Sequence, residues 1–452
     1  MRLKIFGSLL LLLVSIPALA QSPSPISLDE CIRIGLENNQ SLRINRFETD
    51  RSVSQAKSNI SMILPKVDFS LSAGSSGILS PEYGIGQDTL TVISGQGDII
   101  FSTPEATGEY GDRIWHDGSS MSFNLTQNIW DGGVWWNTLK TAKIAKDVAD
   151  IEFTRQELNT IHEVKVAFYN YLSKIKLLDV YSENLTTSNY QHQLTLERFK
   201  LGAASQNDTL RTRVNIEQSR MNIINGKIEV QSKTRELNII LGREWDSPLQ
   251  LQEPVWEMIE IPNINGAMDE VLHNNPNLKL LDRNSEVKAY DVKIARAGYV
   301  PSLGLSVSYS NEAFELGNVF DGNTATLSSG LGLSWNLFNG TSTKRKVEQS
   351  KITAKIATEN YDLAKRNVRN ELARILESME ALKESVKISQ LILTASEQDL
   401  LLAQEQYKIG SLSILDVLRI TDSYEDAKSN LIRTQYNLKI AEAGLLQLMG
   451  KR

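Results

Sequence analysis

The sequence contains almost none of the residues from which disulfides, metal sites and catalytic centres are built. Cys31 is the single cysteine among 452 residues, so no disulfide can form within the chain. The four histidines, His116, His162, His192 and His273, are scattered and form no H-E-x-x-H pair. A G-x-S-x-G elbow, a P-loop and a dinucleotide-binding fingerprint are missing too. We therefore expect no metal, no cofactor and no enzymatic activity.

Excess charge and long apolar runs are also scarce. The 48 basic and 54 acidic residues leave a net charge of −6, and no basic run is present. Nucleic acid is therefore not an expected partner. Beyond the N-terminus, no stretch approaches the ~18 continuous apolar residues of a membrane helix. If the mature chain meets a membrane, we expect it to do so through β-strands or at the surface.

The N-terminus has the order of a secretory signal peptide. A basic start at Met1–Lys4 precedes an apolar core at Leu9–Val14 and the small residues Ala18–Ala20. This order predicts a signal peptide over 1–20, and a buried helix is the alternative. A lipid-modified cysteine would be the first mature residue, whereas Cys31 lies well past the cleavage point. We expect an exported protein without an acyl anchor.

Two long stretches lack proline and are therefore free to form uninterrupted helices. No proline occurs between Pro104 and Pro248, and none follows Pro301. In the second stretch, apolar or small residues recur in alternating steps of three and four, which predicts coiled-coil packing. The predicted elements are two long helices and two return helices, over 133–201, 205–241, 341–409 and 412–449. The seam residues of the third helix are Leu372, Ile375, Met379, Leu382, Val386, Leu393, Leu400, Ala403 and Tyr407.

One turn occurs twice. The segments Glu197–Leu210 and Glu405–Leu418 are identical at six of fourteen positions and are separated by 405 − 197 = 208 residues. The same offset relates flanking segments on both sides, so the chain is an internal duplication. We predict a first repeat over 21–242, a connector over 243–266 and a second repeat over 267–452.

The chemistry of this turn predicts a helical hairpin. Gly202 and Gly410 can adopt the left-handed conformation that ends a helix. Three residues later, Ser205 and Ser413 each begin an S-x-x-D capping box, which ends at Asp208 in the first copy. One helix therefore stops and the next begins within a few residues, and the two must pack antiparallel.

Each repeat opens with one helix, from Ser27 through Ala56 and from Asn265 to before Pro301. The apolar period then changes from about 3.6 to 2, which predicts β-hairpins at about 66–130 and 302–338. The polar faces are Ser, Asn, Thr and Gly, and aromatic residues lie near the strand ends. A half-buried sheet in a soluble domain is the alternative to a membrane barrel. The apolar sets are Val67, Phe69, Leu71 and Ala73; Met121, Phe123, Leu125 and Ile129; Leu303, Leu305, Val307 and Tyr309; and Leu331, Leu333, Trp335 and Leu337.

This organisation resembles the outer membrane efflux protein family, most specifically in the paired turn motifs at the ends of proline-free helices. The resemblance implies a homotrimer in the bacterial outer membrane with a large periplasmic portion. Each subunit would give four strands to one twelve-stranded β-barrel in the lipid, and its helices would form a periplasmic α-barrel. It also implies two partners, a periplasmic adaptor (membrane fusion protein) and an inner-membrane RND or ABC transporter.

The resemblance places functional residues at the two turns. Some family members carry two aspartates one helical turn apart at the periplasmic entrance. Asp416 matches the first, but Arg419 stands at the second, so a double acidic ring is not expected. Helix capping is the simpler role for Asp416. The candidate adaptor contacts are Phe199, Gly202, Ser205, Tyr407, Gly410 and Ser413, and the candidate entrance residues are Asp208, Arg211, Asp416 and Arg419.

Three functions remain open on the sequence. The first is a passive outer-membrane exit duct of a tripartite efflux or type I secretion system. The second is a periplasmic coiled-coil adaptor or scaffold, for which the β-region should read as a globular domain rather than two membrane-length hairpins. The third, a catalytic periplasmic protein, would need a reactive cluster that the sequence does not contain.

Overall fold

The computed structural model describes residues 25–77, 115–256, 260–322 and 324–452. The predicted signal peptide, 1–20, lies outside these ranges, as does most of the loop between the first two strands. The chain divides into two compact units, which we call the helical unit and the sheet unit. The helical unit comprises residues up to Val53, Ala145–Ser285 and Ile356–Arg452, and the sheet unit comprises Ser54–Ile144 and Glu286–Lys355.

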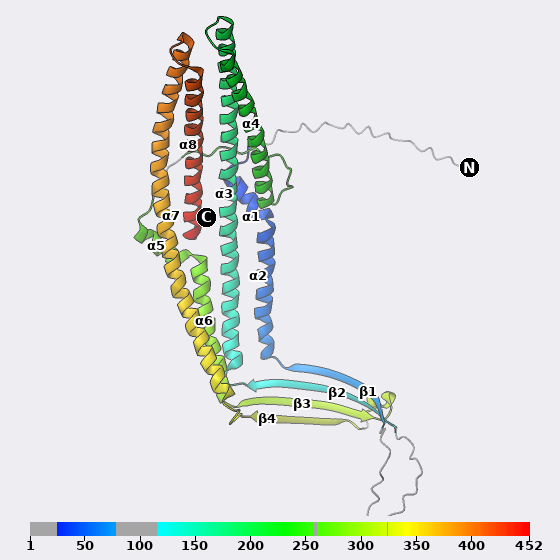
Figure 1. The fold of residues 1–452 in the computed structure, drawn as a ribbon. Helices are drawn as coiled ribbons and strands as arrows, with labels where there is room; N and C mark the ends of the chain where they lie inside the picture. The colour runs from blue at the N-terminus through cyan, green and yellow to red at the C-terminus, as the bar shows by residue number, and fades with distance from the viewer. Residues whose placement is uncertain (1–24, 78–114, 257–259, 323) are drawn as a thin grey trace, which may run out of the picture. The chain divides into compact units, whose positions relative to one another are not determined.

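The helical unit is built from two helical hairpins (Figure 1). The first consists of α3 (Val134–Lys200) and α4 (Gln206–Ile240), and the second of α7 (Ser342–Ile409) and α8 (Ile414–Leu448). Each bound lies within two residues of the limit that the sequence pattern predicts. None of the helices in the described ranges is long and apolar enough to cross a membrane.

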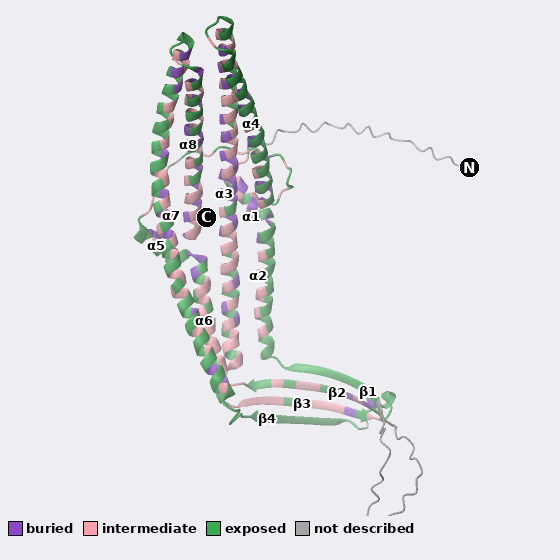
Figure 2. Cartoon of the chain, viewed as in Figure 1, coloured by how far each residue is buried: buried purple, intermediate pink, exposed green. Residues whose placement is uncertain are grey.

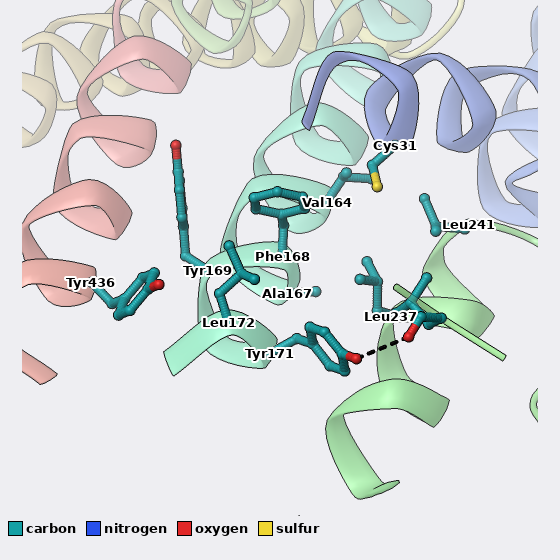
Figure 3. Packing of buried hydrophobic residues seen from close by; sticks show 11 residues of the cluster. Cys31, Val164, Ala167, Phe168, Tyr169, Tyr171, Leu172, Leu237, Leu241 and Tyr436 are labelled. Carbon is teal, nitrogen blue, oxygen red and sulfur yellow. Dashed lines mark hydrogen bonds between the residues drawn. The ribbon is translucent and has the colours of Figure 1, made fainter. Parts of the chain in front are cut away.

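The seam that the heptad pattern marks on α7 is the side on which this helix is buried (Figure 2). Leu372 and Met379 pack in one core with Val271 and Leu445. A second core surrounds Phe168 of α3 and includes Cys31, as Figure 3 shows. The heptad pattern therefore marks residues that are packed in the folded chain. The single cysteine is a core residue.

The opening helices correct one sequence prediction. Where the pattern predicts one helix per repeat, the structure has two. The first pair is α1 (Leu28–Asn38) and α2 (Gln40–Ser58), and the second is α5 (Ile264–Asn274) and α6 (Pro276–Arg296). Short 3-10 helices, η1 (Asn59–Met62) and η2 (Ala297–Tyr299), follow α2 and α6.

An asparagine causes each break. Asn39 Oδ1 accepts from the amide of Leu42 at 3.0 Å, and Asn39 Nδ2 donates to the carbonyl of Ile240 at 2.8 Å. Asn275 repeats both bonds, to Leu278 N at 3.1 Å and to Leu448 O at 2.9 Å. One side chain thus caps the new helix and satisfies a carbonyl at the end of the return helix.

A close approach of two backbones surrounds each asparagine. A Cβ atom at Gly242 would lie 2.3 Å from the carbonyl oxygen of Asn38, and one at Gly450 would lie 2.7 Å from that of Asn274. Only glycine fits there. Both return helices therefore end locked against the opening helix of their own repeat.

In the described part of the sheet unit, the strands form one antiparallel sheet of order β1-β2-β3-β4. Its strands are β1 (Lys66–Gly77), β2 (Trp115–Trp130), β3 (Ser302–Ala313) and β4 (Thr326–Ser334). The two hairpins join through β2 and β3, where Phe123 is paired with Tyr309. The prediction of long helices with four β-strands in two hairpins is confirmed.

The strand limits differ from the predicted ones at two places. Alternation predicts a strand to about Phe338, but β4 ends at Ser334. The indole of Trp335 instead donates to the carbonyl of Tyr299 at 3.2 Å and leaves the ladder. Conversely, β1 continues through Gly77, because its glycine and serine residues pair with residues of β2 before Ser119.

The sheet has one apolar and one hydroxyl-rich face. Cross-strand partners on the polar face bond directly, as in Ser70 with Ser122 at 2.7 Å. Ser308 donates to Asn124 Oδ1 on that face at 2.6 Å. The opposite face carries Phe69 in contact with Phe123, with ring centroids 4.8 Å apart and the rings tilted by 44°. Period-2 alternation thus separates the two chemistries.

Candidate functional site

The first candidate site is the turn between α3 and α4. Gly202 has φ +75°, and the amide of Ala203 donates to the carbonyl of Arg198 at 2.8 Å, which closes the end of α3. Ser205 then caps α4. Its hydroxyl accepts from the amide of Asp208 at 3.2 Å, and its amide donates to Asp208 Oδ2 at 2.9 Å. Both capping-box bonds are present.

The second turn, between α7 and α8, repeats this backbone. Gly410 has φ +88°, and the amide of Ser411 donates to the carbonyl of Gln406 at 2.9 Å. The hydroxyl of Ser413 accepts from the amide of Asp416 at 3.3 Å and lies 2.6 Å from Asp416 Oδ2. The motif therefore gives the same glycine turn and serine cap twice, whereas the reciprocal bond of the capping box is present at Ser205 and not at Ser413.

Side chains from α3 hold the second turn in place. The hydroxyls of Tyr407 and Thr195 lie 2.8 Å apart, and both residues are buried. The guanidinium of Arg198 donates to the carbonyl of Tyr407 and lies 4.6 Å from the centroid of its ring. Arg198 Nη2 also donates to the carbonyl of Ala203 at 3.3 Å. Arg198 therefore connects the two turns.

The candidate entrance residues lie in the first two turns of α4 and α8. Arg419 is exposed, and its Nη1 lies 4.0 Å from Asp416 Oδ1, a loose pair within one helix. The carboxylate of Asp208 accepts from the backbone amide of Ser205, whereas that of Asp416 accepts from the hydroxyl of Ser413. Arg211 is exposed.

A polar seam follows the contact between α3 and α8 away from the turns. Gln191 donates to the hydroxyl of Thr421 at 2.8 Å, and Asn184 donates to the carboxylate of Glu425. Glu425 lines a cavity of about 400 Å³ between α3, α7 and α8. Burial, and next the nearby Asp422 and Asp426 carboxylates, raise the pKa of Glu425 to about 7.

Sequence reasoning missed these α3 residues. At the offset of 208, Thr195 corresponds to Ala403 and Arg198 to Gln406, so the duplication gives no repeated motif to notice. The signal that could have found them is the difference between the two repeats at these positions. Polar side chains stand on α3 where α7 has a small or neutral residue.

Among the residues that the structure describes, no three His, Cys, Asp or Glu side chains gather so as to hold a metal ion. The site geometry is therefore that of a capped, hydrogen-bonded helical tip.

Comparisons with known proteins agree with this architecture. The chain matches the family described as Outer membrane efflux protein over residues 32–243 and 267–451. Outer membrane protein TolC of Escherichia coli K12 is 22% identical over 382 residues, which cover 82% of this chain and 75% of that protein. Alkaline protease secretion protein AprF of Pseudomonas aeruginosa is 22% identical over 347 residues, which cover 75% and 71%.

A solved structure shows the same fold. The CmeC outer membrane channel of Campylobacter jejuni has a TM-score of 0.77 with 18% identity, covering 94% of this chain and 85% of that one. The family match falls in two segments, separated by residues 244–266. With both repeats matched almost end to end, the chain belongs to the outer membrane efflux protein family.

Proposed function

We propose that this chain is one subunit of a trimeric exit duct that crosses the outer membrane. The duct serves a tripartite efflux or type I secretion system. A periplasmic adaptor joins it to an inner-membrane pump of the RND or ABC class, and the cargo then passes to the exterior without further energy input. Family membership supports the location and the transport role. The name of AprF, which assigns that relative to protease secretion, keeps protein cargo open alongside small molecules.

The open sheet is the observation that carries the proposal. In the described part of the chain, β1 pairs only with β2, and β4 pairs only with β3. All nine residues of β4 are exposed. Unpaired edges recruit other strands, and a membrane tolerates only sheets closed into barrels. Three copies joined edge to edge give 3 × 4 = 12 strands and no free edge.

The helical unit supports self-association independently. α3 bonds to α4 through Ser188 and Ser219, and to α8 through Gln191 and Thr421, so α4 and α7 are the outer helices. Each outer helix carries a second apolar seam in heptad register, and these residues are exposed. They are Val214, Met221 and Ile228 on α4, and Ile388, Leu391 and Leu402 on α7. A seam of this kind needs a partner helix, and a second copy supplies it.

The polar face of the sheet fits the wall of a water-filled duct. Along β1 to β4 it presents serine, asparagine, threonine and glycine, which bond to one another across the strands. Such a surface hydrates solutes without binding any one charge type strongly. We therefore assign no catalytic residue and no cofactor to this protein.

The two turns are the proposed contact with the adaptor. Phe199, Gly202 and Ser205 present an exposed surface, whereas Tyr407 is buried and acts by holding its turn against α3. Gly410 and Ser413 shape the second turn. We propose that the periplasmic entrance is lined by Asp208, Arg211, Asp416 and Arg419.

The alternative, a periplasmic adaptor or scaffold, is not favoured. A soluble scaffold would have to cover the apolar sheet face, which is largely exposed in this chain. The family match also covers both repeats. The duct remains the function that accounts for both units.

A pair of adjacent substitutions tests the proposal. Leu305 lies on the apolar face and Ser306 on the polar face of β3. Arginine at Leu305 should cost about 2–4 kcal/mol near the bilayer midplane, and arginine at Ser306 much less. We expect Leu305→Arg to abolish the heat-dissociable trimer in detergent-extracted outer membrane and Ser306→Arg to retain it. Equal assembly of the two variants, or recovery of the parent chain from the soluble periplasmic fraction, would reject the duct.

A further inference from the structure

The loop between β3 and β4 folds back over the apolar face of the sheet. Its 3-10 helix η3 (Leu316–Phe320) contacts β2 and β3, and Val319 within it is fully buried. Asn311 Nδ2 donates to the carbonyl of Val319 at 2.6 Å, and Asn311 Oδ1 accepts from the hydroxyl of Thr324. Asn311 is paired in register with Met121, which belongs to the apolar set. The loop therefore lies on the apolar side and leaves the hydroxyl-rich side free.

Burial within the sheet supports this placement. Among sheet residues whose burial is described, only Ser119, Met121 and Asn311 are buried. The register places all three on the same face and at the same end of the strands. The chain thus covers this end of the apolar face with its own loop, while the rest of that face stays open.

The loop that covers this end of the face exposes apolar side chains of its own. Phe314 and Phe320 are 81% and 61% exposed, and Leu316 is exposed too. Leu316 and Phe320 belong to η3, which packs on the apolar face, and Phe314 directly follows β3. The loop therefore adds exposed apolar side chains at this end of the sheet.

The height of this loop matches the far side of a membrane. Trp130 is paired with Leu303 at the other end of the sheet, where Trp335 also lies. From Leu303 to Phe314 the chain advances 314 − 303 = 11 residues. At about 3.3 Å per residue and a strand tilt of about 35–45°, the rise is about 26–30 Å. The apolar band of an outer-membrane barrel is about 25 Å tall between two aromatic girdles.

We propose that Phe314, Leu316 and Phe320 anchor each subunit in the outer leaflet, at the boundary between acyl chains and headgroups. The inference rests on the proposed function, because it requires the apolar face of the sheet to face lipid. The nearby charges are all acidic, with no Lys or Arg between positions 301 and 343. An anionic lipid surface would repel these charges, so the acyl chains, rather than charged headgroups, are the partner that these side chains fit.

Quenching by brominated lipid tests the anchor on the full-length trimer. Single variants Phe314→Cys and Phe320→Cys would be labelled with a bimane dye and reconstituted into phosphatidylcholine vesicles with brominated acyl chains. Leu331→Cys, on the apolar face of β4, is the lipid-facing reference, and Ser310→Cys, on the polar face of β3, is the matched control. Native Cys31 stays unlabelled near neutral pH, because burial raises the pKa of its thiol to about 12.

We expect brominated lipid to quench the dye at Phe314 and Phe320 as strongly as at Leu331 and several-fold more than at Ser310. If the dye at Leu331 is quenched but the loop dyes respond only to aqueous iodide, the anchor is wrong and the duct stands. If the loop dyes escape both quenchers, another protein surface covers them and the anchor is again wrong. If the dye at Leu331 is itself not quenched, the proposed function fails first.

Discussion

Tyr407, in the last turn of α7, is 4% exposed, whereas its counterpart Phe199, in the last turn of α3, is 43% exposed. The two turns otherwise match, with a positive-φ glycine and a serine cap in each. The second turn packs in its own core with Ile414 and Val417, and Leu194 of α3 joins it. At the first turn, Leu201 and Leu210 are exposed.

The difference teaches that position in the bundle, rather than motif, decides what each turn does. α3 lies between α4 and α8, so the end of α3 meets α7 and α8 of the same chain. At the first turn α4 bonds to α3 through Thr212 and His192, and the side chains of Leu201 and Leu210 stay exposed. In a trimer, the first turn is therefore the one left to face a neighbouring copy or a partner.

The largest expected difference in stability between the two turns follows removal of the aromatic ring at Tyr407 or at Phe199. Tyr407→Ala should lower the free energy of unfolding of the helical unit by about 3–5 kcal/mol, because it opens a cavity in a packed site. Phe199→Ala should cost about 1 kcal/mol or less, since the ring is partly exposed. Circular dichroism during denaturation of the detergent-solubilised protein measures both.

Tyr407→Phe is the matched control for the hydroxyl bond to Thr195. It should cost about 0.5–1.5 kcal/mol, the usual net value of one hydrogen bond. Equal losses for the two alanine variants would contradict the difference in burial.

Substitution of the turn glycines should affect the two turns equally, because each glycine acts only within its own turn. Both have φ between +75° and +88°, so valine strains each turn by about 1–3 kcal/mol. We expect Gly410→Val and Gly202→Val to uncouple export from the adaptor while the trimer still assembles. Gly266→Val, with open space around it and no positive φ, is the control. Normal export in either tip variant would show that the turn tolerates the strain.

A pH titration compares the two return helices. The offset of 208 relates Glu425 to Glu217, which is exposed and lies 3.1 Å from Arg220. With the pKa of Glu425 raised from 4.5 to about 7, the folded chain holds a proton that the unfolded chain has lost between these values. The free energy of unfolding therefore falls as pH rises from about 4.5 to 7 and changes no further above that.

Glu425→Gln should remove this loss, because an amide imitates the protonated carboxyl. A full shift of 7 − 4.5 = 2.5 units is worth about 3 kcal/mol, and partial contact with water reduces the gain at pH 8 to about 1–2 kcal/mol. At pH 4.5 the variant and the parent should be equally stable. The other charges facing the site remain in place, and they are Asp422, Asp426, Glu397 and the pair of Glu183 with Lys428. Glu217→Gln, at the corresponding exposed position, is the matched control. A Glu425→Gln gain that is constant with pH would rule out titration of Glu425.

The smallest effect concerns the entrance. The pair of Arg419 with Asp416 within one chain is loose and exposed, worth about 0–1 kcal/mol. We predict that Arg419 also pairs with an acidic neighbour on another copy, either Asp208 or Asp416, and that threefold symmetry multiplies this contact into a closed state. Arg419→Ser should then raise single-channel conductance in planar bilayers at low salt, where screening is weakest. Unchanged conductance would leave Arg419 as a solvated helix residue.

Much of the fold could be predicted because its signals are local or repeated. Missing proline marks the long helices, alternation marks the strands, and glycine followed by a serine cap marks each turn within about fourteen residues of chain. The two features that the sequence predicted wrongly, the helix break and the end of β4, have a common origin. The break at Asn39 depends on the carbonyl of Ile240, which is 201 positions away. The end of β4 depends on the contact of Trp335 with Tyr299.

The sequence by itself determined the duplication, the element types and the backbone of the two turns, because these depend on φ preferences and on hydrogen bonds between residues three to five apart. Only the tertiary structure decided that Tyr407 is buried while Phe199 is exposed, and that the loop after β3 covers the apolar face. The bond between Tyr407 and Thr195 joins residues 212 positions apart. No local pattern encodes such a pair, since its partners meet only after the long helices have packed and closed the chain between them.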